Sequence, residues 1–163
     1  MLKTAILACA AALMLGACAP SKFKTYDGPA VTEVRVFKDA RKMYLMHGER
    51  ALAAYDVGLG FMPVGHKQHE GDGRTPEGSY MIVKRNPNSK YYLSIGIDYP
   101  RPADVARARS MGLSPGGDIF IHGRGDITNP FRDWTAGCIA VTNDEIEDIY
   151  AMVPDGTPIN IYR

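Results

Sequence analysis

The sequence is poor in cysteine, has no excess of charge of either sign, and contains no apolar run long enough to cross a bilayer. Its three cysteines are Cys9, Cys18 and Cys138, too few for a disulfide framework. The 19 basic and 18 acidic side chains nearly cancel, which argues against a nucleic-acid partner, because that partner requires a basic surface. The apolar run from Ala5 to Leu15 is far shorter than the roughly 20 residues of a spanning helix.

The N-terminus has the pattern of a secretory signal, with an early cation, the apolar run and then small residues. Leu15-Gly16-Ala17-Cys18 resembles a bacterial lipoprotein cleavage box, and by that resemblance Cys18 becomes the acylated first residue of the mature protein. Ala19 then favours the outer membrane. The alternative is a plain secretory signal. We expect a lipoprotein signal peptide over residues 1–17, a lipidated N-terminus and polar tether over 18–30, and a location on the periplasmic face of the outer membrane.

The rest of the chain, residues 31–163, predicts a single mainly β domain, sandwich- or barrel-like, with two short helices. Strands are expected around 34–36, 44–46, 51–59, 79–83, 91–97, 119–122, 138–141 and 158–162. A helix is expected from Pro102 to Met111, because proline opens it and glycine follows it. A second is expected from Asn143 to about Met152, capped by Thr142 or Asn143.

The stretch from Asp118 to Asn143 carries the candidate chemistry. A β-prone run, Ile119-Phe120-Ile121, delivers His122 to a strand end, and Cys138 begins a second apolar run. Two neighbouring strands that end together would place imidazole and thiol side by side, which is the minimum for a base-activated cysteine nucleophile. A lone thiol in an oxidising compartment is either buried and inert or kept for its chemistry, and the neighbouring residues favour the second.

The residue types suggest a role for each member of this pair. Cys138 would be the nucleophile, with a pKa lowered by the imidazole, and His122 would take its proton and return one to a leaving amine. A carboxylate could orient the ring, and Asp118, Asp126 and Asp133 are all near in sequence. The alternative is that thiol and imidazole are merely buried core groups.

Other residues of the stretch would shape the site or contact substrate. Backbone N–H groups around Gly137 and Cys138 would hold an oxyanion, Gly137 would let substrate backbone approach closely, and Thr135 would shape the turn. Arg124 and Arg132 could bind substrate carboxylates, although ordinary solvated charges are equally expected there. Trp134 could stack on substrate, although a packing role is the stronger expectation.

Three ordered motifs carry a family resemblance. They are the loop Gly71-Asp72-Gly73-Arg74-Thr75-Pro76-Glu77-Gly78, then His122-Gly123, then Thr135-x-Gly137-Cys138-Ile139. Together they resemble the signature of L,D-transpeptidases (the YkuD-type domain), over nearly all of Val31 to Arg163. Such enzymes attack the bond between the L-centre of diaminopimelate and the terminal D-alanine of a peptidoglycan stem peptide, and form a thioester.

The resemblance also implies partners and site residues. An amine from a second stem peptide, or from an anchored lipoprotein, would take the acyl group, whereas water would give trimming. The Gly123 carbonyl would orient the imidazole, and Asn143, which the family pattern retains, joins Arg124, Arg132 and Trp134 as a candidate substrate-binding residue. No cofactor and no metal are implied. The family's arginine two positions after the cysteine is Ala140 here, and the histidine or lysine common before the glycine is Ala136, so donor-stem recognition is expected to differ.

Four alternatives fit less well. A papain- or NlpC/P60-like peptidase places cysteine before histidine, and a sortase has a different cysteine motif. A zinc site built from His66, His69, His122 and Cys138 lacks the usual ligand spacing. A non-catalytic peptidoglycan-binding lipoprotein would leave the intact Cys/His pair unexplained.

Overall fold

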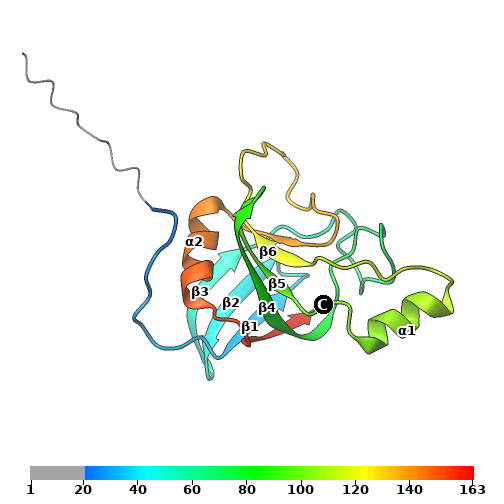
Figure 1. Cartoon of the computed structure of the whole chain (residues 1–163), viewed down its shortest axis with the longest axis horizontal. Helices are drawn as coiled ribbons and strands as arrows, with labels where there is room; N and C mark the ends of the chain where they lie inside the picture. The colour runs from blue at the N-terminus through cyan, green and yellow to red at the C-terminus, as the bar shows by residue number, and fades with distance from the viewer. Residues whose placement is uncertain (1–20) are drawn as a thin grey trace, which may run out of the picture.

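The structure is a computed structural model that describes residues 21–163, so the predicted signal peptide and Cys18 lie outside the described residues (Figure 1). The chain is mainly β with two helices, as the sequence predicts. The strands are β1 (Glu33–Phe37), β2 (Lys42–His47), β3 (Arg50–Asp56), β4 (Gly78–Ser89), β5 (Tyr92–Ile97), β6 (Phe120–His122), β7 (Ile139–Ala140) and β8 (Pro158–Tyr162), and the helices are α1 (Pro102–Ser110) and α2 (Asn143–Met152).

The eight strands form one mixed sheet in the order β3-β2-β1-β8-β4-β5-β6-β7. Two neighbouring pairs, β1 with β8 and β6 with β7, are parallel, and the other pairs are antiparallel. An antiparallel bridge between Gly58, just after β3, and Ala140 in β7 connects the two edges of the sheet. This bridge, with N–H···O distances of 2.8 Å in both directions, gives the sheet a partly closed, barrel-like shape.

Strand β4 is longer than the sequence predicts. The predicted strand ends at Val83, before a polar segment that contains Pro87, which cannot donate to a ladder. In the structure the strand continues to Ser89 and pairs with β5 through two register shifts, the second of them between Asn86 and Ser89, around the proline. The irregular pairing accommodates the missing N–H, so β4 and β5 extend as far as the cavity described below.

Helix α2 fixes the end of the sheet that carries β6 and β7. It begins at a capping box in which the Thr142 hydroxyl accepts from the Glu145 N–H at 3.2 Å and the Glu145 carboxylate accepts from the Thr142 N–H at 2.8 Å. Its apolar face, with Ile146 and Ile149 fully buried, packs on β5 and β6. Thr142 is therefore the cap, and the helix begins at Asn143, directly beside the candidate site.

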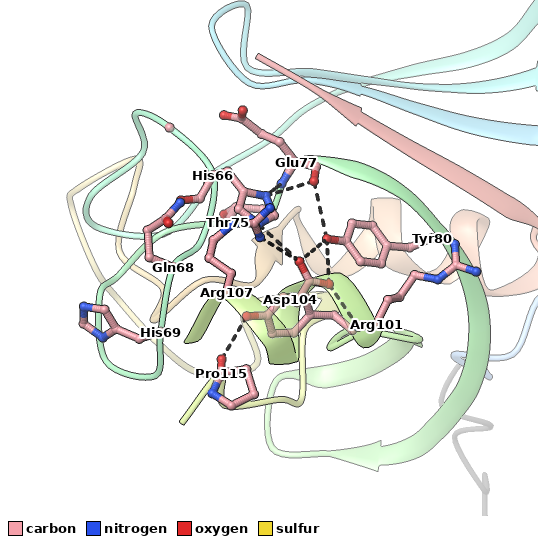
Figure 2. A network of polar contacts seen from close by, with 12 residues as sticks. His66, Gln68, His69, Thr75, Glu77, Tyr80, Arg101, Asp104, Arg107 and Pro115 are labelled. Carbon is pink, nitrogen blue, oxygen red and sulfur yellow. Dashed lines mark hydrogen bonds and ion pairs between the residues drawn. The ribbon is translucent and has the colours of Figure 1, made fainter. Parts of the chain in front are cut away.

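Helix α1 holds the long loop between β3 and β4. The His66 ring, from that loop, contacts Asp104 and Arg107 of α1, and Asp104 also accepts from the Tyr80 hydroxyl (Figure 2). Nε2 of His66 lies 3.2 Å from the Asp104 carboxylate, and its Nδ1 lies 2.9 Å from Glu77 backbone atoms. The loop is thus attached at both its middle and its C-terminal end.

The described part of the predicted tether follows α2 rather than extending away from the domain (Figure 1). Lys24 forms an ion pair with Asp148 at 2.7 Å, and the Phe23 ring lies 6.1 Å from that of Tyr150. Within residues 21–163, no helix is both long and apolar enough to span a bilayer.

Candidate active site

Strands β6 and β7 bring His122 and Cys138 to one cavity of about 500 Å³. Its lining residues are Asn86, Ser89, Lys90, Tyr91, Ser94, Asp118, Phe120, His122 and Cys138. In the parallel register Ile139 faces Ile121, so continuing by one residue puts Cys138 beside Phe120. Because side chains alternate along a strand, Phe120, His122 and Cys138 share a face. The prediction of neighbouring strands is confirmed, but the two side chains are diagonal neighbours rather than ends of aligned strands.

The His122 ring is oriented by the backbone. Its Nδ1 lies 2.6 Å from the Gly123 carbonyl oxygen, which can only accept, so Nδ1 carries the hydrogen and Nε2 of the neutral ring is a free acceptor. Burial lowers the pKa of His122 below its ordinary value, against the opposing effect of that carbonyl. The ring is therefore neutral at pH 7.

None of the three weighed carboxylates orients this ring. Asp133 pairs with Arg41 at 2.8 Å, Asp118 pairs with Lys84 at 3.2 Å, and Asp126 is exposed. The carbonyl that the family resemblance implies holds the ring instead.

Two aromatic rings enclose the imidazole. Tyr91 stacks on His122 with ring centroids 4.4 Å apart and an interplanar angle of 23°, and Trp134 meets it edge-on at 5.7 Å and 71°. Trp134 does not line the cavity and packs edge-on against both Tyr91 and His122, which agrees with the packing role that the sequence favours. The sequence reasoning missed Tyr91, because an aromatic residue before a strand carries no signal of its contact with a distant histidine.

The Cys138 thiol is held by backbone groups. Its sulfur accepts from the Phe120 N–H and donates to the Asp118 carbonyl, both at 3.4 Å. Burial raises the pKa of the Cys138 thiol, the Phe120 N–H and the Lys67 ammonium oppose this shift, and Asp118 adds to it. His122 is not among the groups that lower this pKa, because a neutral ring offers no positive charge. Thiol and imidazole are thus both neutral at rest.

The turn before the cysteine is shaped as predicted, but one expected oxyanion donor is already used. The Thr135 hydroxyl donates to the Cys138 carbonyl at 2.7 Å and accepts from the Gly137 N–H at 3.1 Å. Of the two expected oxyanion donors, this leaves the Cys138 N–H. Gly137 has φ 139°, and a Cβ there would lie 2.7 Å from the Arg74 carbonyl oxygen. The glycine is thus required by the protein's own backbone rather than by an approaching substrate.

Asn143 holds the loop that carries the Gly123 carbonyl. Its side-chain oxygen accepts from the N–H groups of Arg124 and Gly125 at 2.8 and 2.9 Å, and its amide donates to the Gly125 carbonyl at 3.2 Å. These hydrogen bonds engage its side chain within the protein, and its contact with substrate stays a prediction. Asn143 positions the histidine loop from the first turn of α2.

Replacing Asn143 by alanine is expected to lower the free energy of unfolding by about 1–3 kcal/mol, because two part-buried N–H groups lose their acceptor. Release of the Gly123 carbonyl should also slow turnover by about tenfold. Asn143→Asp keeps an oxygen acceptor at the same place and is the matched control, with a smaller loss in both thermal melting and D-alanine release. Equal losses in the two variants would contradict this role.

The two candidate arginines lie away from the thiol. Arg132 pairs with Asp56 at 3.0 Å and donates to the Val57 carbonyl, and Arg124 donates to the Asn129 carbonyl at 2.6 Å. Both line a separate cavity of about 200 Å³ that contains neither His122 nor Cys138. Their predicted substrate contacts are not supported, since hydrogen bonds to the protein's own loops engage both guanidinium groups.

The four groups weighed as a zinc site do not converge. His66 faces Asp104 and Arg107, whereas His69 points away from that network (Figure 2). Among residues 21–163, no group of three or more potential metal-ligating side chains forms a candidate metal site.

Comparison with known proteins agrees with the motifs and the geometry. A sequence profile of the L,D-transpeptidase catalytic domain (YkuD) matches residues 32–161. The chain belongs to the L,D-transpeptidase family. YafK of Escherichia coli (strain K12), an L,D-transpeptidase by name, is 32% identical over 126 residues, which cover 74% of this chain and 46% of YafK.

Two solved structures share the fold. The helical cell shape determining protein Pgp2 from Campylobacter jejuni matches with a TM-score of 0.63 and 25% identity, over 79% of this chain and 46% of Pgp2. Bd1075 of Bdellovibrio bacteriovorus matches with a TM-score of 0.59 and 26% identity, over 82% and 48%. This L,D-transpeptidase chain therefore spans about half the length of the relatives it matches.

Proposed function

We propose that this protein catalyses cysteine-dependent acyl transfer on peptidoglycan stem peptides. The observation that carries the proposal is the shared cavity of His122 and Cys138, in which the Gly123 carbonyl fixes Nδ1–H and leaves Nε2 free to accept the thiol proton. The family membership supports a peptidoglycan substrate. The acyl donor is a tetrapeptide stem ending in diaminopimelate and D-alanine.

The reaction proceeds through a thioester. The Cys138 sulfur attacks the carbonyl carbon at the L-centre of diaminopimelate, while its proton passes to Nε2 of His122. The carbon–nitrogen bond then breaks, and D-alanine departs with the proton that His122 returns. The Cys138 N–H stabilises the oxyanion between these two steps. An amine then attacks the thioester, loses a proton to His122 and regenerates the thiol.

The acceptor is proposed to be an amine of a second stem or of an anchored lipoprotein, with water as the alternative. Alanine at positions 136 and 140 removes two side chains that the family resemblance associates with this site, which favours altered substrate recognition. Pgp2 is named as a determinant of helical cell shape. We place this protein likewise in cell-wall remodelling and the control of cell shape.

Incubation of the purified protein with disaccharide-tetrapeptide tests the function. D-Alanine should be released, with a crosslinked dimer when an amine acceptor is supplied. If a tripeptide were the sole product, the acceptor would be water rather than an amine, and the reaction would be hydrolysis. Absence of D-alanine release under all conditions would contradict the proposed activity and favour a non-catalytic peptidoglycan-binding protein.

Neutral resting groups predict a specific pH dependence. Because burial raises the pKa of Cys138, alkylation by iodoacetamide should be slow at pH 7 and rise about tenfold per pH unit into the alkaline range, without a plateau near neutrality. Quenched time points analysed by mass spectrometry give the rate. Fast alkylation with a plateau between pH 5 and 7 would instead show a preformed thiolate–imidazolium pair.

The location follows from the N-terminal motif. We propose that Cys18 is acylated after removal of residues 1–17 and anchors the domain to the periplasmic face of the outer membrane. Lys24 and Phe23, which contact α2, would keep the domain close to that surface. A mass spectrum of the mature N-terminus without the lipid mass would contradict the anchor.

A further inference from the structure

A second cavity lies against Cys138 and is independent of His122. Its volume is about 180 Å³, and its lining residues are Lys67, Glu70, Gly71, Gly116, Gly117, Asp118, Ile119, Ala136 and Cys138. Ordinary ligand sites measure about 300–1,000 Å³, so this cavity suits a small group. Three glycines and one alanine contribute no long side chains to it. The thiol therefore borders a large cavity containing His122 and a small one containing a lysine.

That lysine is buried, yet most of its hydrogen-bonding capacity is unused. Lys67 is 3% exposed, and within residues 21–163 its ammonium has one hydrogen-bond partner, the Asp72 carboxylate at 2.9 Å. Lys38, the other buried lysine, donates to the Gly65 carbonyl, the Thr75 carbonyl and the Glu77 carboxylate. An ammonium has three donors, so Lys38 is satisfied, whereas Lys67 has two donors left beside an open cavity.

The loop geometry holds Lys67 in place before any ligand arrives. The Asp72 carboxylate accepts from the backbone N–H groups of Gln68, His69 and Arg74 at 2.6, 3.3 and 3.0 Å. Burial would raise the pKa of Asp72, but these N–H groups and the Lys67 ammonium lower it, so the carboxylate is ionised. The preceding residue, His66, attaches the same loop to α1 (Figure 2). The ammonium is thus preorganised for a partner of opposite charge.

The other charges at the cavity do not compete for that partner. Glu70 is exposed, and the Asp118 carboxylate is 82% exposed and paired with Lys84, so water screens both. Lys67 is the one buried cation of the lining. Its charge reaches the sulfur, since it favours the thiolate of Cys138.

We propose that this small cavity is the subsite for the terminal residue of the stem peptide, and that Lys67 binds the carboxylate of that residue. The inference rests on the proposed function and names a binding group for its donor. A terminal D-alanine is small, carries a free carboxylate and is one bond away from the carbonyl that Cys138 attacks. The family resemblance associates a histidine or lysine with the position of Ala136. In this chain Lys67 supplies a cation at that side of the site instead.

The test compares two stem tetrapeptides, one with a terminal carboxylate and one with a terminal carboxamide. Lys67→Met keeps the aliphatic stem, and Asp72 retains its three backbone donors. On the acid substrate kcat/KM should fall about 10- to 100-fold, and on the amide it should change less than about threefold. Lys67→Arg should retain most of the preference for the acid. The matched control is Lys24→Met, which removes a lysine of the N-terminal tether that pairs with Asp148 of α2, and it should alter turnover of neither substrate.

Equal losses on acid and amide in Lys67→Met would overturn the proposal, because Lys67 would then act on the thiol or on another carboxylate. Ala136→Leu, at an exposed position, fills the cavity and should slow both substrates. Unchanged turnover in Ala136→Leu would exclude the cavity as a subsite.

Binding separates this inference from the proposed function. In a Cys138→Ala background, calorimetry should show tighter binding of the acid than of the amide, and Lys67→Met should abolish the difference. That result would support the subsite even if the wild type released no D-alanine. Equal binding of acid and amide to Cys138→Ala would overturn the subsite even if turnover were observed.

Discussion

Cys138→Ala is expected to reduce D-alanine release to the uncatalysed background, while the melting temperature changes by only a few degrees. The sulfur forms the proposed covalent bond, and no other cysteine lies in the described part of the chain. Its contacts, a backbone N–H and a backbone carbonyl at 3.4 Å, are weak, so their loss has a small structural effect. The measurement is D-alanine quantified by chromatography, with circular dichroism for the fold.

Cys138→Ser is the matched control for this prediction. The hydroxyl retains the shape and the hydrogen bonds, but it ionises far less readily than a thiol. Activity should therefore be lost in the serine variant as completely as in the alanine variant. Release above a few per cent of wild type in either variant would assign the nucleophile to another group.

His122→Gln is expected to lower kcat/KM by about 10²–10⁴-fold, the usual contribution of a general acid–base. The glutamine amide can still donate to the Gly123 carbonyl, so the loop keeps its hydrogen bond, whereas the group that accepts the thiol proton is gone. The pH profile should also change. In the wild type, activity should rise with pH as His122 loses its proton. This rise should lie below the ordinary pKa of histidine, because burial lowers the pKa of His122, and it should be absent from the variant.

His47→Gln is the matched control, because the His47 side chain is exposed and its ring bonds to the Ala30 carbonyl, at 2.8 Å, away from the cavity that contains Cys138. It should leave turnover unchanged. Activity of His122→Gln within about tenfold of wild type would contradict the role of His122, as would retention of the acid limb.

The fold was predictable wherever local pattern determines structure. Alternation gave the eight strands, and Pro102 and Thr142 marked the starts of the two helices within a residue. The order of strands was not predictable, because the parallel pairing of β1 with β8 joins the two ends of the domain. The continuation of β4 past Pro87 depends on register shifts that only the partner strand determines.

Site residues whose role follows from their residue type and motif were predictable from the sequence. Those whose role depends on which distant segment their side chain contacts were not. His122 and Cys138 line one cavity because the neighbouring strands β6 and β7 bring them there, and the Gly123 carbonyl contacts the His122 ring. The loop contacts of Arg124, Arg132 and Asn143 were not predictable, because their nearness in sequence to the thiol says nothing about which loop each one binds. Lys67 and Tyr91 were missed, since both come from segments far from Cys138 along the chain.

The largest chemical difference between the sequence prediction and the structure concerns the protonation state of Cys138 and His122. A thiol beside an imidazole suggests an ion pair when only the sequence is considered. Burial disfavours both charged forms, so thiol and imidazole are both neutral, and in the proposed reaction proton transfer accompanies attack. In the proposed oxidising compartment this state would also protect the thiol from oxidation, because the thiolate is the reactive form.

Intact-mass analysis of the protein mixed with tetrapeptide stem and quenched in acid tests the central claim most directly. The account predicts an adduct equal to the stem minus D-alanine, attached at Cys138, labile to hydroxylamine and absent from Cys138→Ala. D-Alanine release from wild type without any such adduct at any quench time, or an adduct that survives in Cys138→Ala, would contradict it.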